Sequence, residues 1–246
     1  MSSALWFVAV FSAAVIVHEL GHFLAARRCG LLVGEFAIGF PFSPRVITLF
    51  SHRETEFTIR LLPIGGFIGF SGGDEPGGFG ALSSRQKLVV IAAGPVFNIV
   101  FAGILFPLYF MFHAGMPLLA AVAKSAVLMQ TAFIGTGQFL FHLVSTGSLD
   151  GLAGPVGIAS MAGAAALAGV WSIIYFVAVL SLSLGIMNFL PLPALDGGQI
   201  VMLAAERLKG SPFSERTLAL VNNAGMALLL LLSAVVTVKD VAALLA

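Results

Sequence analysis

Residues 4–26 read ALWFVAVFSAAVIVHELGHFLAA, an apolar run with two histidines and a glutamate near its end. About 20 apolar residues are enough to cross the hydrocarbon core of a bilayer as a helix. The rest of the chain has the same character: 59% of its 246 residues are hydrophobic and only 9% are charged, whereas a soluble domain carries roughly 25% charged residues. A backbone in lipid must satisfy its own hydrogen bonds, and the apolar runs have helix length, so the sequence predicts an all-α membrane protein.

Three further runs, residues 88–112, 170–189 and 218–238, also have the length of a membrane span, so we expect four transmembrane helices. Another apolar stretch, residues 117–144, contains a lysine, a glutamine and a histidine and is interrupted by two glycines. This stretch is compatible either with a fifth span or with helices that lie on the membrane surface. The distribution of positive charge distinguishes these two interpretations.

Lysine and arginine are concentrated in two of the predicted loops. Seven of the 12 lie between the first and second spans, and three lie between the third and fourth. Cytoplasmic loops carry an excess of these residues, and four spans place all ten on the cytoplasmic side. A fifth span would separate the two groups. We therefore predict peripheral surface helices over residues 117–144 and both termini on the periplasmic or extracellular side.

The first predicted cytoplasmic loop contains a strand pattern, because residues 54–70 read ETEFTIRLLPIGGFIGF. Phe57 and Ile59 alternate with polar residues, and Gly65 and Gly66 lie where the chain would turn back. The sequence thus predicts a β-hairpin over residues 54–70. The pattern alone does not decide between a cytoplasmic hairpin and one that enters the membrane under the cover of other segments. We find no separate soluble domain, so residues 1–246 are expected to form a single domain.

The candidate chemistry lies in the first span, at His18-Glu19-Leu20-Gly21-His22. Two histidines at i and i+4 share one helical face and are close enough to hold one Zn²⁺, and the glutamate between them is placed to take a proton from a zinc-bound water. Ionisable groups inside a membrane helix are costly and usually functional. The alternative is a set of polar residues that are hydrogen-bonded inside a helix bundle.

A catalytic zinc usually has a third protein ligand, which must lie at the same depth in the membrane. Asp196 meets this requirement, because it follows the third span in the segment NFLPLPALDGG at residues 188–198. The third span would deliver it to the side of the membrane on which the first span places His18 and His22. Locally, an Asp-Gly pair is also typical of an ordinary turn. Glu206 is a weaker rival, because it lies beside Arg207 in a charged loop.

Five short motifs follow one another along the chain. They are residues 18–22, LPIGGF at residues 62–67, Ala93-Gly94-Pro95 with Asn98, Gly154-Pro155 with Ile158, and residues 188–198. Together they resemble the site-2 protease family of intramembrane zinc metalloproteases, over most of the chain. The resemblance is closest to the bacterial branch that regulates sigma-E. It implies that one Zn²⁺ is bound by His18, His22 and Asp196 and that Glu19 is the catalytic acid and base.

The resemblance also implies a set of substrate-binding residues. Residues 54–70 correspond to the membrane-reentrant hairpin of the family, whose edge strand could clamp a substrate by main-chain pairing. The residues expected to bind substrate are Phe57, Ile59, Gly65, Gly66 and Phe67 in this segment, together with Asn188, Pro191 and Asn98, the last of which could instead be a hydrogen bond between packed helices.

The implied function is hydrolysis of peptide bonds in or near the transmembrane segments of single-pass membrane proteins, such as anti-sigma factors or signal-peptide remnants. We expect a bacterial inner-membrane protein with its active site towards the cytoplasm. The PDZ domains of the sigma-E branch are not found, because only residues 114–151 occupy their place. A metal or solute transporter using the same polar cluster and an inactive membrane scaffold remain alternatives. A net charge of +1 gives no indication of a nucleic-acid partner.

Overall fold

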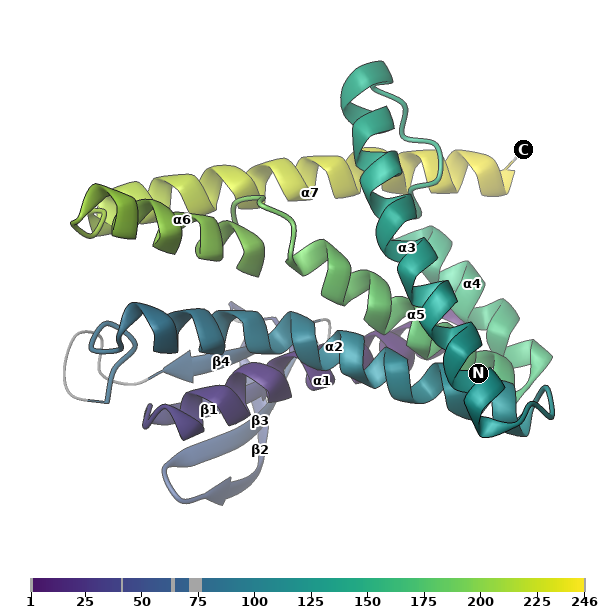
Figure 1. The fold of residues 1–246 in the computed structure, drawn as a ribbon, viewed down its shortest axis with the longest axis horizontal. Helices are drawn as coiled ribbons and strands as arrows, with labels where there is room; N and C mark the ends of the chain where they lie inside the picture. The colour runs from purple at the N-terminus through teal and green to yellow at the C-terminus, as the bar shows by residue number, and fades with distance from the viewer. Residues whose placement is uncertain (1, 41, 63–64, 71–76, 246) are drawn as a thin grey trace.

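Most of the chain is helical. The computed structural model describes residues 2–40, 42–62, 65–70 and 77–245. The helices in these residues are α1 (Ser3–Arg28), α2 (Ser84–Phe112), α3 (Leu118–Thr146), α4 (Pro155–Ala168), α5 (Val170–Asn188), α6 (Asp196–Lys209) and α7 (Glu215–Leu245). A small sheet and α6 lie at the end of the molecule opposite the N-terminus (Figure 1).

Among the described residues, five helices rather than the predicted four are long and apolar enough to cross a membrane: α1, α2, α3, α5 and α7. The additional one is α3, which is a single 29-residue helix and not a set of short surface helices. Its two internal glycines do not break it, because an isolated glycine costs a helix only about 1 kcal/mol. Lys124 lies over the ring of Phe110, 4.6 Å from its centroid, which accommodates the charge against an apolar neighbour.

The direction of α3 differs from that of the other long helices. Figure 1 shows α3 running across α2 rather than alongside it. Its N-terminal half packs against α2, where Ala121 and Ser125 are buried, whereas Phe141 and Val144 near its C-terminal end are exposed. The length and composition of α3 therefore fit a span, while its packing holds only one half of it against the helix bundle.

The strands are β1 (Val33–Ile38), β2 (Arg45–His52), β3 (Thr55–Arg60) and β4 (Gly66–Phe70), in the order β2-β3-β1-β4. The predicted hairpin over residues 54–70 is wrong in its pairing, because β1 lies between β3 and β4. β1 pairs parallel to β3 and antiparallel to β4, and the hairpin of the sheet is β2–β3. Residues 63–64 of the predicted turn lie outside the described part of the chain.

A buried strand explains why the two predicted strands are separated. Val33, Phe36 and Ala37 of β1 are buried, so this strand takes the central position that the hairpin prediction left empty. Glu35 of β1 accepts hydrogen bonds from Thr58 (2.5 Å) and Arg60 (2.8 Å) of β3. Burial would raise the pKa of the Glu35 carboxyl group, but these two bonds, together with the positive charges of Arg60 and Arg45, hold it below its usual value. An ionised carboxylate thus links the parallel strands at neutral pH.

Small residues let the three central helices approach closely. A side chain at Gly21 of α1 would meet the backbone oxygen of Ala93 on α2, and a Cβ at Gly185 of α5 would lie 2.9 Å from the backbone oxygen of Pro95. Close backbone approach at small residues is a main source of helix association in membranes. Further along α2, Phe106 is fully buried in the cluster shared with α5. The polar residues of α1 and α2 are therefore held in a fixed relation.

Replacing Gly185 by alanine is expected to destabilise the protein by about 1–3 kcal/mol, because the new Cβ would force α5 away from α2. Gly135→Ala on α3 is the matched control, since a Cβ there meets no atom within 4 Å. Thermal unfolding of the detergent-solubilised protein, followed by size-exclusion chromatography, measures both. Equal unfolding temperatures for the two variants would contradict the close-packing interpretation.

Candidate functional site

A cavity of about 460 Å³ opens where α1, α2, α6 and β4 meet. Its polar lining consists of His18, Glu19, His22, Asn188, Asp196 and Gln199. The described apolar lining consists of Gly66, Phe67, Ile68, Phe70, Phe79, Val90, Ile91 and Ala194. The cavity thus combines a cluster of metal-binding and titratable side chains with one strand of the sheet, which is a typical arrangement of a ligand site.

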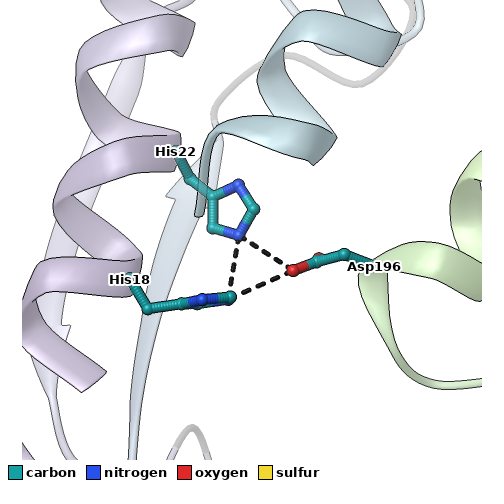
Figure 2. A group of neighbouring side chains, drawn as sticks. All are labelled: His18, His22 and Asp196. Atoms are coloured by element: carbon teal, nitrogen blue, oxygen red, sulfur yellow. Dashed lines mark hydrogen bonds and ion pairs between the residues drawn. The ribbon is translucent and has the colours of Figure 1, made fainter. Parts of the chain in front are cut away.

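Three side chains converge at one point of this cavity, as Figure 2 shows. The Nε2 atoms of His18 and His22 lie 3.1 and 3.4 Å from Oδ2 of Asp196 and 3.2 Å from each other. The histidines come from α1 and the aspartate from the start of α6 (Figure 2). Each residue offers one atom to a common centre, since the three candidate ligand atoms lie within 4.8 Å of one another.

The chemistry of this cluster fits a metal ion. In the described part of the chain, Oδ2 of Asp196 is buried and accepts no hydrogen bond, although both imidazole nitrogens are near. A buried carboxylate oxygen without a partner is costly, and a cation at the common centre would remove that cost. Two imidazole nitrogens and one carboxylate oxygen are also a donor set that zinc prefers.

Helix α2 orients His22. The Nδ1 atom of His22 lies 2.7 Å from the backbone oxygen of Val90. A carbonyl oxygen can only accept, so Nδ1 carries the proton and Nε2 is left as a free lone pair directed at the common centre. Gly94 makes room for the ring, because a side chain there would meet His22 Nε2 and Cε1. The i and i+4 spacing then places His18 beside it on α1.

The segment after α5 brings Asp196 to the histidines. Asp196 is the first residue of α6, and the two residues that follow it are glycines within the first turn of that helix. A Cβ at Gly197 would meet the backbone oxygens of Phe189 and Leu190, and one at Gly198 the backbone oxygen of Leu192. These glycines let the preceding loop fold tightly over the helix start.

Glu19 lies between the cluster and the sheet. It is partly buried, and a Cβ added to Gly66 of β4 would lie 2.8 Å from its Cγ atom. Glu19 therefore stands between the histidines in sequence and against the β4 backbone in space. No larger residue than glycine fits at the start of β4 without displacing the glutamate or Val15, whose Cγ1 would be 3.0 Å away.

The predicted substrate-binding residues divide into two groups. Gly66, Phe67 and Asn188 line the cavity. The amide of Asn188 donates to the backbone oxygen of Leu184 in its own helix. Gly65 precedes β4 with φ +102° and Pro191 lies in the loop before α6; neither lines the cavity.

Three other predicted residues lie away from the cavity. Phe57 and Ile59 are on β3, which β1 separates from β4. The ring of Phe57 stacks on Phe50 at 4.4 Å between centroids. Asn98 is fully buried on α2, and its amide nitrogen lies 3.4 Å from Nδ1 of His18. The structure thus places Asn98 behind a histidine of the cluster and not at the cavity surface.

Several cavity residues were not anticipated from the sequence. Ile68 and Phe70 lie on the predicted return strand, and Gln199 follows Asp196 by one helical turn, so all three positions carried a usable signal. Val90 acts through its backbone oxygen, and its apolar side chain gave no indication of this contact. Phe79 lies in the loop before α2, where no periodic pattern marks it.

Comparison with known proteins agrees with this geometry. A putative zinc metalloprotease of Clostridium acetobutylicum is 27% identical, with 95% of this chain and 96% of the relative aligned. The zinc metalloprotease RasP of Geobacillus kaustophilus is 25% identical over 98% of each chain. The regulator of sigma-W protease RasP of Bacillus subtilis is 24% identical, also over 98% of each. These alignments extend over 327, 415 and 427 positions, so the relatives contain segments without a counterpart in these 246 residues.

The model of peptidase family M50 matches residues 6–232, a range that includes every residue of the candidate metal-binding cluster and of the cavity. Sequence motifs, cluster geometry and relatives of nearly full coverage all agree with this match. The chain therefore belongs to peptidase family M50, the site-2 proteases, and is a zinc metalloprotease.

Proposed function

We propose that this protease cleaves peptide bonds within or next to the transmembrane segments of single-pass membrane proteins. In this proposal His18, His22 and Asp196 bind one zinc ion and Glu19 is the catalytic acid and base. The observation that carries it is the convergence of His18 and His22, on an apolar helix of membrane length, with Asp196 of α6, beside an open strand edge. A peptide bond must then reach the cluster at the depth of a membrane helix.

In the proposed hydrolysis the residues of the cavity have separate roles. Zinc, when bound, supplies a Lewis acid that polarises the scissile carbonyl and lowers the pKa of water. Glu19 accepts the proton of the attacking water and returns it to the leaving amine. Val90 keeps the His22 ring in one orientation through its backbone oxygen. Asn188 and Gln199 add neutral polar groups to the cavity wall, where they can hold the peptide by hydrogen bonds.

Strand β4 is suited to hold the substrate in extended form. A helical segment hides its amides in i to i−4 hydrogen bonds, so it must unwind before a carbonyl can be attacked. Among the described strands β4 pairs only with β1, which leaves its other edge open. Gly66, Phe67 and Ile68 of β4 line the cavity beside Glu19. Addition of the substrate as a further strand would present its carbonyl groups to the cluster.

The charge distribution supports an orientation in the membrane. Ten of the 12 basic residues lie either from the end of α1 to the start of α2 or from the end of α6 to the start of α7, near the end of the molecule that carries the cluster. By the positive-inside rule this end faces the cytoplasm of a bacterial cell. With α1, α2, α5 and α7 as the spans and α3 not crossing the membrane, both termini face outward. The exposed apolar side chains of β2, among them Val46, Leu49 and Phe50, would then contact lipid at the cytoplasmic side.

The proposed substrates are anti-sigma factors or signal-peptide remnants, both of which present a single membrane helix. One relative is named a regulator of sigma-W protease, which supports a regulatory role of this kind. Membership of a protease family disfavours the transporter interpretation. An inactive scaffold would retain the fold but not the hydrolysis, so a cleavage assay on the wild-type protein distinguishes it.

Glu19→Gln is expected to keep its zinc and to lose at least about 100-fold in cleavage rate, because the proton acceptor is removed and the ligands stay. Cleavage of a tagged single-pass membrane protein in liposomes and zinc content by mass spectrometry measure the two effects. Glu206→Gln is the control, since its amide oxygen can still accept from the backbone nitrogen of Phe213. Cleavage by the Glu19 variant at the wild-type rate would show that another group is the base. A wild-type protein that does not cleave would favour the scaffold.

Asp196→Ala is expected to lower bound zinc to less than about one tenth of the wild-type content, because a catalytic zinc needs its third protein ligand. Asp150→Ala, an exposed carboxylate in the loop before α4, is the control and should leave the zinc content unchanged. Chelation of the wild-type protein should abolish cleavage, and added zinc should restore it. Full cleavage by the chelated protein would reject the metal mechanism.

Gly66→Ala is expected to reduce cleavage by at least about tenfold while zinc content stays the same, because the new Cβ displaces Glu19. Gly103→Ala on α2 is the matched control, since a Cβ there lies 3.7 Å from the side chain of Met129, an ordinary contact. The same liposome assay and zinc measurement apply. If both variants cleave equally well, the close contact between β4 and Glu19 has no role in catalysis.

A further inference from the structure

Behind His18 a buried polar chain crosses three helices. The amide nitrogen of Asn98 on α2 lies 3.4 Å from Nδ1 of His18 on α1. On its other side, the hydroxyl of Ser181 on α5 lies 3.0 Å from the backbone oxygen of Asn98 and 3.2 Å from its Oδ1 atom. Asn98 and Ser181 are both 0% exposed. Polar groups in such an apolar bundle are costly unless each finds a partner, so this row of buried polar side chains needs a specific explanation.

The row of polar side chains ends at Nδ1 of His18, the ring nitrogen that does not face the common centre. An imidazole that binds a metal through Nε2 carries its proton on Nδ1, and that proton needs an acceptor. His22 has such an acceptor in the backbone oxygen of Val90. At His18 the corresponding position is occupied by the amide of Asn98, a group that can present either an oxygen or a nitrogen.

In the structure the Asn98 amide presents its nitrogen, and not its oxygen, to His18. With its nitrogen towards Nδ1 of His18, the Asn98 amide can only donate there, which requires the imidazole proton to be on Nε2. In this orientation Oδ1 of Asn98 accepts from Ser181. Nε2 then has no lone pair for a metal ion.

Rotation of the Asn98 amide by half a turn exchanges its oxygen and nitrogen while both stay within reach of the same neighbours. Oδ1 then accepts the Nδ1 proton of His18, and Nε2 becomes a free lone pair. Ser181 permits this exchange, because a hydroxyl can accept from the amide nitrogen while it still donates to the backbone oxygen of Asn98. His18, Asn98 and Ser181 thus each keep a hydrogen-bond partner in both orientations of the amide.

We propose that Asn98, held by Ser181, is the positioning residue that fixes His18 as the Nδ1-protonated tautomer when zinc binds. It thereby acts on metal affinity and not on the substrate. The inference rests on the proposed function, because it requires His18 to bind zinc through Nε2. It also accounts for the burial of Asn98 away from the cavity surface.

Zinc affinity of the full-length protein in detergent tests this proposal, measured by competition with a chromogenic chelator. Asn98→Leu keeps the volume but removes the acceptor, and its zinc dissociation constant should rise about 10–100-fold, the usual effect of losing such a partner. Asn98→Asp restores an acceptor for the Nδ1 proton and should stay within about threefold of wild type. A purely structural role of the amide predicts the reverse order, since a buried charge at this position disrupts packing more than leucine does.

Ser181→Ala provides a second variant that keeps the proposal testable if Asn98→Leu does not fold. It should raise the zinc dissociation constant by about threefold or more, because the amide loses the partner that accepts in the zinc-bound orientation. Ser125→Ala is the matched control, a buried serine on α3 whose hydroxyl donates to the backbone oxygen of Ala121 in its own helix. Its zinc affinity should equal that of the wild type.

The outcomes separate this inference from the proposed function. If the wild-type protein binds no zinc, or binds it equally well after Asp196→Ala, the metal site itself is wrong. If the wild type depends on Asp196 but Asn98→Leu and Ser181→Ala bind zinc as tightly as it does, only the role of Asn98 is overturned. Tight binding by Asn98→Asp together with weak binding by Asn98→Leu supports tautomer selection.

Discussion

The close approach of α1 and α2 is the contact on which the candidate metal site depends. Gly21 lets α1 reach the backbone of α2, and Gly94 leaves the space that the His22 ring occupies. Only at this separation can the backbone oxygen of Val90 accept from Nδ1 of His22. Because neither glycine carries a side chain, the two helices pack closely and the rigid bundle holds the imidazole of His22 in one orientation. That is what a metal ligand requires.

The site also illustrates how a lipid-embedded bundle tolerates polar groups. Asn98, Ser181 and His18 form one connected chain, and Asp196 approaches both histidines. Each group is costly alone, whereas together they leave one buried acceptor, Oδ2 of Asp196, at the centre where a cation fits. Packing and chemistry therefore use the same residues. The open edge of β4 completes the site by bringing backbone groups next to Glu19.

Prediction from the sequence was strongest where the signal is local. Hydropathy located α1, α2, α5 and α7, because each is a continuous apolar run. For residues 117–144 the distribution of positive charge favoured surface helices, whereas the chain forms one long helix of span length. The sheet was only half predicted. The strand patterns of β3 and β4 were visible, but the order of strands depends on β1, whose short buried run reads equally well as loop.

By itself, the sequence determined the membrane class, the four apolar spans common to prediction and structure, and the pairing of His18 with His22, since i and i+4 neighbours meet in any helix. Only the tertiary structure decided that Asp196 reaches both histidines, that Asn98 lies behind His18 instead of facing the cavity, and that β4 is the edge strand beside Glu19. These contacts join segments far apart in the chain. Their geometry follows from helix packing at glycines and from strand order, which no local pattern encodes.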